Sequence, residues 1–124
     1  MVPNTRNVAI VTDLNSEVLV LNTTSKKIEK QFSPTQRTSH LLAFHPLQEL
    51  IFTSNMESNT VSVINSNNGD ILKIITCQKN TEGIDISPDG KELWVTNALD
   101  NTIQIIDTDQ FKIRHTIPSG KRPL

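Results

Sequence analysis

The chain reads IDISPDGKELWVTN at residues 84–97, and this stretch aligns without a gap on LAFHPLQELIFTSN at residues 42–55. The alignment continues, with DNTIQIID at 100–107 over SNTVSVIN at 58–65. A third, more divergent copy starts at Val8, with its register shifted by one residue. A fixed period of about 42 residues indicates one supersecondary unit that is used several times, each copy burying its apolar face against its neighbours.

Each copy predicts four short strands separated by turn residues. In the best copy the first strand covers 83–86 and ends at Ser-Pro-Asp-Gly, in which Pro sets φ for the turn and Gly accepts a positive φ. The β-prone run at 92–96 predicts the second strand, and 102–107 the third. The fourth alternates apolar and polar residues over 111–117. No helical periodicity competes, so the predicted class is all-β.

Four antiparallel strands repeated in this way predict the blades of a β-propeller. We therefore interpret residues 1–124 as a partial β-propeller of about three blades. The expected units are 7–38, in which the first strand is missing, then 39–80 and 81–124.

The repeat resembles the YVTN-type β-propeller family, which includes surface-layer-like and periplasmic propellers. The resemblance rests on Trp94-Val95-Thr96-Asn97 with the Ser-Pro-Asp-Gly-Lys before it, and on the Asp-Asn-Thr-Ile and Ile-Ile-Asp-Thr after it. It covers nearly the whole chain. Phe52-Thr53-Ser54-Asn55 replaces the name-giving tetrapeptide in the second copy, and Ala9-Ile10-Val11-Thr12 lacks the Asn in the first. The signatures of tryptophan–aspartate repeats are absent. The resemblance implies a periplasmic or extracellular location.

A propeller needs at least about four blades to close a ring, and this chain supplies fewer. Two explanations stay open: the chain is a fragment of a larger propeller, or it completes a ring by self-association. Either way we expect its partners to be further blades, in the same chain or in other copies. An isolated monomer would expose strand edges and apolar blade faces.

Composition excludes several other classes of function. The formal net charge of −1 gives no electrostatic reason to expect nucleic acid or an anionic membrane as a partner. Cys77 is the only cysteine, so neither an internal disulfide nor a Cys-based zinc site is expected. No stretch approaches the roughly 20 apolar residues of a membrane span, and the first residues lack the apolar run of a signal peptide.

The loops before the first strand and after the second strand of each unit are expected to share one rim of the propeller. Polar side chains that converge on a concave rim are where a ligand or protein partner would bind. The candidate rim residues are Arg37, His40, Asn55, Glu57, Glu82, Asn97 and Asp100. The competing interpretation is that these Asn, Asp and Thr positions serve the turns, and Asn97 in particular is expected to cap local backbone groups.

No catalytic residue, metal site or cofactor site is predicted. His40 and His45 lie five residues apart on an extended segment, so they cannot share a metal. His115 is expected to be packed beside Phe111 and Ile113. Cys77 would be reactive only with a lowered pKa. Motifs for a nucleophile elbow, a phosphate loop or a zinc protease are absent.

Two function hypotheses follow. The first is a non-catalytic scaffold that presents its rim to a protein or a small ligand. The alternative is part of a propeller enzyme, lactonase-like or cofactor-dependent dehydrogenase-like, with ligands drawn from several blades. The fold alone cannot decide between them. The predicted inter-blade core consists of Phe52, Val61, Val63, Leu93, Val95, Ile103 and Ile105.

Overall fold

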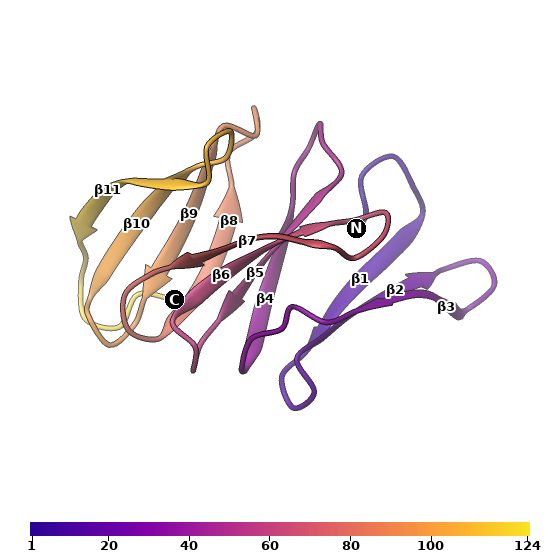
Figure 1. The fold of residues 1–124 in the computed structure, drawn as a ribbon, viewed down its shortest axis with the longest axis horizontal. Coiled ribbons are helices and arrows are strands. Elements are labelled where there is room, and N and C mark those ends of the chain that lie inside the picture. Colours follow the sequence, from indigo (N-terminus) through magenta and orange to yellow (C-terminus); the bar gives the residue numbers. More distant parts are fainter.

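The computed structural model describes residues 1–124 as eleven strands in three separate antiparallel sheets, without a helix (Figure 1). Blade 1 contains β1 (Asn7–Thr12), β2 (Glu17–Asn22) and β3 (Lys27–Phe32). Blade 2 contains β4 (Ser39–Phe44), β5 (Leu50–Asn55), β6 (Thr60–Asn65) and β7 (Ile71–Thr76). Blade 3 contains β8 (Thr81–Ile86), β9 (Glu92–Asn97), β10 (Thr102–Asp107) and β11 (Lys112–Pro118). No helix is long and apolar enough to cross a membrane.

Within each sheet every strand pairs with the strand before it in the chain, as in a propeller blade. The all-β blade architecture predicted from the repeat is confirmed. Blade 1 has three strands, and its register places Asn7 opposite Asn22, as blade 2 places Leu50 opposite Asn65. The strand β1 therefore corresponds to β5 and β9, the second strands of the other blades.

Two apolar clusters fill the spaces between the blades. The larger one joins blades 2 and 3, with Phe52, Val61 and Val63 on one side and Leu93, Val95 and Ile106 on the other. The smaller one joins blades 1 and 2 through Val18, Ile51 and Ile64. Successive residues of a strand point to opposite faces of its sheet. Each blade therefore has an N-side face toward the preceding blade and a C-side face toward the following one.

The prediction that Ile103 and Ile105 belong to the core between two blades of this chain was wrong. Ile103 pairs with Thr96 and Ile105 with Trp94, whereas Leu93 and Val95 point to the other face of the sheet. Ile103 and Ile105 therefore belong to the C-side face of blade 3, which no blade of this chain covers. Ile105 is nevertheless buried within its own sheet. The repeat correctly predicted that both residues take the positions of Val61 and Val63, but it carries no information on which blade faces are covered.

The prediction that His115 is packed was also wrong, because its side chain is exposed. The pairing of β10 with β11 shifts between Ile105 and Ile106, so Ile106 lies opposite Ile113 and Ile105 lies opposite His115. This bulge places the extra residue Arg114 between the two pairs. Phe111 and Ile113 consequently pack on the larger cluster, whereas His115 turns to the open C-side face.

A repeated hydrogen bond that we call the inter-blade latch ties each blade to the segment that follows it. The turn residue Asn59 has a φ of 57° and accepts the backbone N–H of Asn80 through its side-chain oxygen at 2.7 Å. Asn101, with a φ of 54°, accepts the N–H of Arg122 at 2.9 Å in the same way. In blade 1 the Ser16 hydroxyl accepts the N–H of Ser39 at 3.3 Å. Asn tolerates this left-handed conformation better than most residues.

Candidate functional site

Backbone hydrogen bonds bring the predicted rim loops together at one end of the blades. The N–H of Met56, after β5, donates to the carbonyl of Thr38, before β4, at 2.9 Å. The N–H of Ala98, after β9, donates in the same way to Asn80, before β8, at 2.9 Å. The segments that precede the first strand and follow the second strand of each blade therefore share one edge, which we call the rim.

One ionisable side chain from each blade meets at this rim. His40 Nδ1 lies 3.2 Å from Asp13 Oδ1, and His40 Nε2 lies 4.0 Å from Glu82 Oε1. Asn80 donates a hydrogen bond to the other oxygen of Glu82 at 3.1 Å. The three side chains are 53% (Asp13), 33% (His40) and 18% (Glu82) exposed, so water and solutes can reach them. We call this group the Asp13–His40–Glu82 row.

The backbone of three blades positions this row. His40 and Glu82 are each the second residue of their blade's first strand, in β4 and β8. The Ser54 hydroxyl further ties the two strands by donating to the carbonyl of Glu82 at 2.5 Å. Asp13 directly follows β1 of blade 1.

Sequence reasoning missed Asp13. The register of blade 1 places it where the other blades have Met56 and Ala98, neither of which is charged. A charged residue that departs from the repeat at a rim position was the signal that could have identified it. The one-residue shift of the first copy hid this correspondence.

The remaining exposed rim candidates, Arg37, Glu57 and Asp100, lie apart from the row. Arg37 and Glu57 form an ion pair of 2.8 Å, with side chains that are 80% and 53% exposed. Asp100 accepts the backbone N–H of Lys79 at 2.8 Å, so it supports the rim backbone. Exposed ion pairs contribute little to stability, and Arg37 and Glu57 are therefore free to exchange their partners for a ligand.

Asn55 and Asn97 are fully buried and do not reach the rim surface. The side-chain oxygen of Asn55 accepts the hydroxyls of Ser39 at 2.7 Å and Thr53 at 3.1 Å. Its amide donates to Thr60 and Ser62, both at 3.0 Å. Asn97 occupies the equivalent place in blade 3 and binds Thr81, Thr102 and Gln104. Both residues hold their own strands together from inside the blade.

His45 and Cys77 do not contribute reactive groups. His45 is buried, and its Nδ1 accepts the backbone N–H groups of Leu47 and Gln48 at 3.1 and 3.0 Å, which closes the turn after β4. The ring lies against Gly90, where a Cβ would come within 2.5 Å of it. Burial raises the pKa of the Cys77 thiol to about 12, so it is not a thiolate nucleophile near neutral pH. No three His, Cys, Asp or Glu side chains are placed to hold a metal ion.

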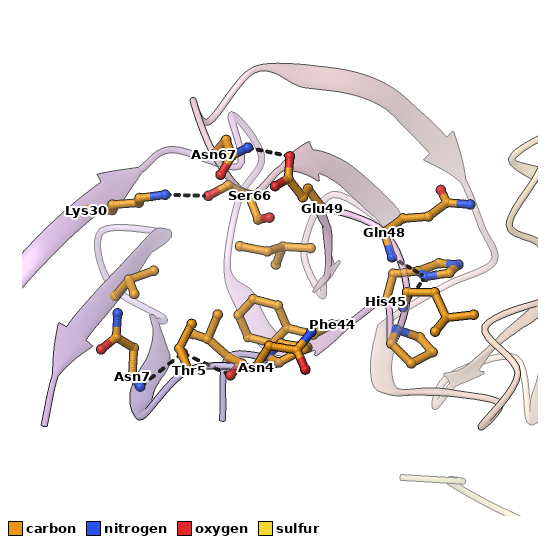
Figure 2. Close-up of a pocket in the computed structure, with 16 residues that line it drawn as sticks. Asn4, Thr5, Asn7, Lys30, Phe44, His45, Gln48, Glu49, Ser66 and Asn67 are labelled. Atoms are coloured by element: carbon orange, nitrogen blue, oxygen red, sulfur yellow. Dashed lines mark hydrogen bonds between the residues drawn. The ribbon is translucent and has the colours of Figure 1, made fainter.

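A pocket of about 410 Å³ lies between blades 1 and 2, near the turns after β4 and β6 (Figure 2). Lys30 reaches across it to the carbonyl of Ser66 at 3.2 Å, and Asn67 donates to Glu49. Phe44 and Ile51 supply part of its apolar lining. Its charged side chains are thus engaged by protein groups on its own walls. The row at the rim, which draws one side chain from each blade, is the stronger candidate site.

Comparison with known proteins shows the fold of the chain but does not assign it to a family. No family model and no curated protein matches the chain. The YVTN resemblance therefore stays a prediction.

Several solved structures match nearly its whole length. A hydrazine synthase of Kuenenia stuttgartiensis has a TM-score of 0.90 and 24% identity, covering 98% of this chain and 35% of that one. The dihydro-heme d1 dehydrogenase NirN in complex with DHE has a TM-score of 0.77 and 18% identity over 95% of this chain and 25% of its own. Apo AztD from Citrobacter koseri has a TM-score of 0.77 and 13% identity, covering 98% of this chain and 34% of that one.

All three proteins contain β-propellers. The chain thus spans between a quarter and about a third of the length of these proteins. At these identities the likeness is one of fold, and this fold is the β-propeller.

Proposed function

We propose that this chain is a non-catalytic β-propeller scaffold that binds a ligand or a protein segment at its rim. The observation that carries the proposal is the Asp13–His40–Glu82 row, in which three successive blades each contribute one side chain to one place. Side chains from separate repeats that converge on a shared rim are typical of binding sites on repeat folds.

The chemistry of the row favours a ligand that donates hydrogen bonds and carries positive charge. Two carboxylates flank the imidazole, and no Lys or Arg side chain pairs with either of them. Partial exposure leaves both carboxylates able to exchange a contact with His40 for a contact with an incoming group. An ammonium or guanidinium group on a peptide or a small molecule matches these features.

A titration with an arginine-rich peptide tests this proposal, with a glutamate-rich peptide of equal length as the probe of opposite charge. We expect the arginine-rich peptide to shift the amide NMR signals around residues 13, 40 and 82. The variant Glu82→Gln should weaken its affinity about fivefold, because a partly exposed ion pair contributes about 1 kcal/mol. The control Glu29→Gln removes a carboxylate that binds only Asn7 and Asn22, and it should leave the affinity unchanged.

The proposal is wrong if neither peptide binds, or if Glu29→Gln and Glu82→Gln weaken binding equally. Equal weakening would mean that the peptide responds only to the net charge of the protein.

An enzyme remains the second candidate, and the same row favours it. A carboxylate that orients an imidazole is an arrangement used in general-base catalysis, and His40 lies between two carboxylates. Two of the structural neighbours are named as a synthase and a dehydrogenase. Measurable hydrolysis of a lactone that disappears in both His40→Ala and Glu82→Ala would favour the enzyme over the scaffold.

A further inference from the structure

The C-side face of blade 3 has the composition of an interface, although no blade of this chain covers it. It carries Trp94, Ile103, Ile105 and Ile117. Each stands one repeat after a residue of the C-side face of blade 2, in the order Phe52, Val61, Val63 and Ile75. The blade 2 residues are at most 5% exposed because blade 3 covers them. Trp94 and Ile117 are each 41% exposed.

The N-side face of blade 1 is also apolar and uncovered. The register of β1, β2 and β3 places Val8, Ile10, Leu19, Leu21 and Ile28 on this face. Ile10 is 45% and Ile28 is 55% exposed. Exposed apolar side chains that gather on one face mark an interaction surface.

Blade 1 is more apolar on this face than the blade whose equivalent face is buried. Ile10 and Leu19 take the positions that Thr53 and Ser62 occupy in blade 2, whereas Glu17 takes the position of Thr60. A face selected only for contact with water would show the opposite trend, because exposed positions favour polar residues. The substitution of apolar for polar residues therefore indicates that another surface covers this face.

The chain itself shows which surface fits each of these faces. At both internal boundaries the C-side face of one blade packs on the N-side face of the next. The segment after β11 follows the same path as the linker between blades 2 and 3. The N–H of Ser119 donates to the carbonyl of Asn101 as Cys77 donates to Asn59, both at 2.9 Å. Leu124 then lies against Gly83, at the inner edge of the open face.

From these observations we infer that two copies of the chain associate head to tail. The C-side face of blade 3 in one copy covers the N-side face of blade 1 in the other. This contact is heterologous, since the two copies use different surfaces. Two such contacts close a ring of six blades, which lies within the range of about four to eight blades seen in propellers. The register also places charged residues on the C-side face: Asp85 on the edge strand β8, and Glu92, Asp107 and Lys112 together at one end of the sheet.

The mass of the chain in solution tests the association, and two variants test its direction. Ile10→Asp disables the N-side face and Ile117→Asp disables the C-side face. We expect the wild-type chain to be a dimer by light scattering and each variant alone to be a monomer. An equimolar mixture should recover a dimer, because one intact face of each kind remains. The control Leu14→Asp introduces the same charge at a fully exposed loop residue and should stay dimeric.

Trp94 provides a second readout, because it is the only tryptophan and lies on the C-side face. Its emission should shift to shorter wavelength as the wild-type concentration rises, and again in the mixture. Ile10→Asp alone should show no shift. Circular dichroism establishes that each variant is folded, and Ile28→Asp repeats the N-side test at a more exposed position.

Three outcomes would overturn the inference. The wild-type chain could remain a monomer at every concentration. A single-face variant could associate as the wild type does, which would mean that each copy uses the same surface. The mixture of the two variants could stay monomeric, which would mean that the two faces do not bind each other.

Discussion

Phe52 and Trp94 occupy the same position of the repeat, yet Phe52 is fully buried and Trp94 is 41% exposed. Both side chains lie on the second strand of a blade, on its C-side face. The pairing of their strands is the same, and both residues are aromatic. Their neighbours differ: blade 3 follows blade 2, and no blade of this chain follows blade 3. In a repeat protein the neighbouring repeat buries much of the surface that a single repeat leaves exposed.

The largest expected difference in stability is between the alanine variants of these two aromatic residues. Phe52→Ala should lower the free energy of unfolding by about 3–5 kcal/mol, as other large-to-small changes in cores do. Trp94→Ala should cost only about 1 kcal/mol, because much of its side chain is already in water. Urea unfolding at low protein concentration, where copies do not associate, provides the measurement. Equal costs for the two variants would show that the C-side face of blade 3 is covered from within the same copy.

A smaller effect on stability should distinguish the buried Asn97 of blade 3 from Thr12, its counterpart on the uncovered N-side face of blade 1. Asn97→Ala should cost about 1–3 kcal/mol, because it removes three hydrogen bonds from a buried polar network. Thr12 takes the equivalent position in blade 1, on the uncovered N-side face, and is only partly buried. Water can replace its contacts, so Thr12→Ala should cost less than about 0.5 kcal/mol. Urea unfolding of the two variants makes the comparison. A cost for Thr12→Ala as large as that for Asn97→Ala would contradict it.

The smallest effect concerns a turn that all three blades share. The side-chain oxygens of Asn22 and Asn65 each accept two backbone N–H groups, and in blade 3 Asp107 does the same with Asp109 and Gln110. The hydrogen bond from the Gln110 N–H is the largest cause that lowers the pKa of Asp107 below 3.8. The ionised carboxylate is therefore favoured in the folded state.

Its contribution to stability should be complete above about pH 4 and decline as the pH falls through the lowered pKa. Asp107→Asn gives blade 3 the turn residue of the other two blades and should remove this part of the acid dependence. Thermal unfolding of both proteins from pH 6 to pH 2.5 tests the prediction. It is contradicted if the melting temperatures of the two proteins fall in parallel over this range.

Much of the fold could be predicted from the sequence because the determinants of a blade are local. Turn residues such as Pro88 and Gly90, with β-prone runs between them, indicate strand positions without any knowledge of distant contacts. The bulge in β11 could not be predicted, because it depends on the pairing with β10 and leaves no residue signature of its own. Strict alternation predicts that Phe111, His115 and Ile117 share one face of the sheet. Because of the bulge, His115 and Ile117 lie on the face opposite Phe111.

The candidate site could be predicted only where it follows the repeat. His40 and Glu82 were identified because they hold equivalent positions in consecutive units. Asn55 and Asn97 hold equivalent positions too, but the repeat does not show whether a polar residue points outward or binds its own sheet. Asp13 departs from the repeat, and its approach to His40 depends on how blade 1 is packed against blade 2.

The inter-blade latch has a consequence for how such a chain can change in length. Asn59 and Asn101 each hold the linker that follows their own blade, through a bond that involves no more distant repeat. This part of each blade junction is therefore specified within one unit and the start of the next. A gene duplication that copies one whole unit brings its own latch with it and disturbs no other boundary. The number of blades can thus evolve in whole steps, each new unit carrying the hydrogen bond that holds its own linker.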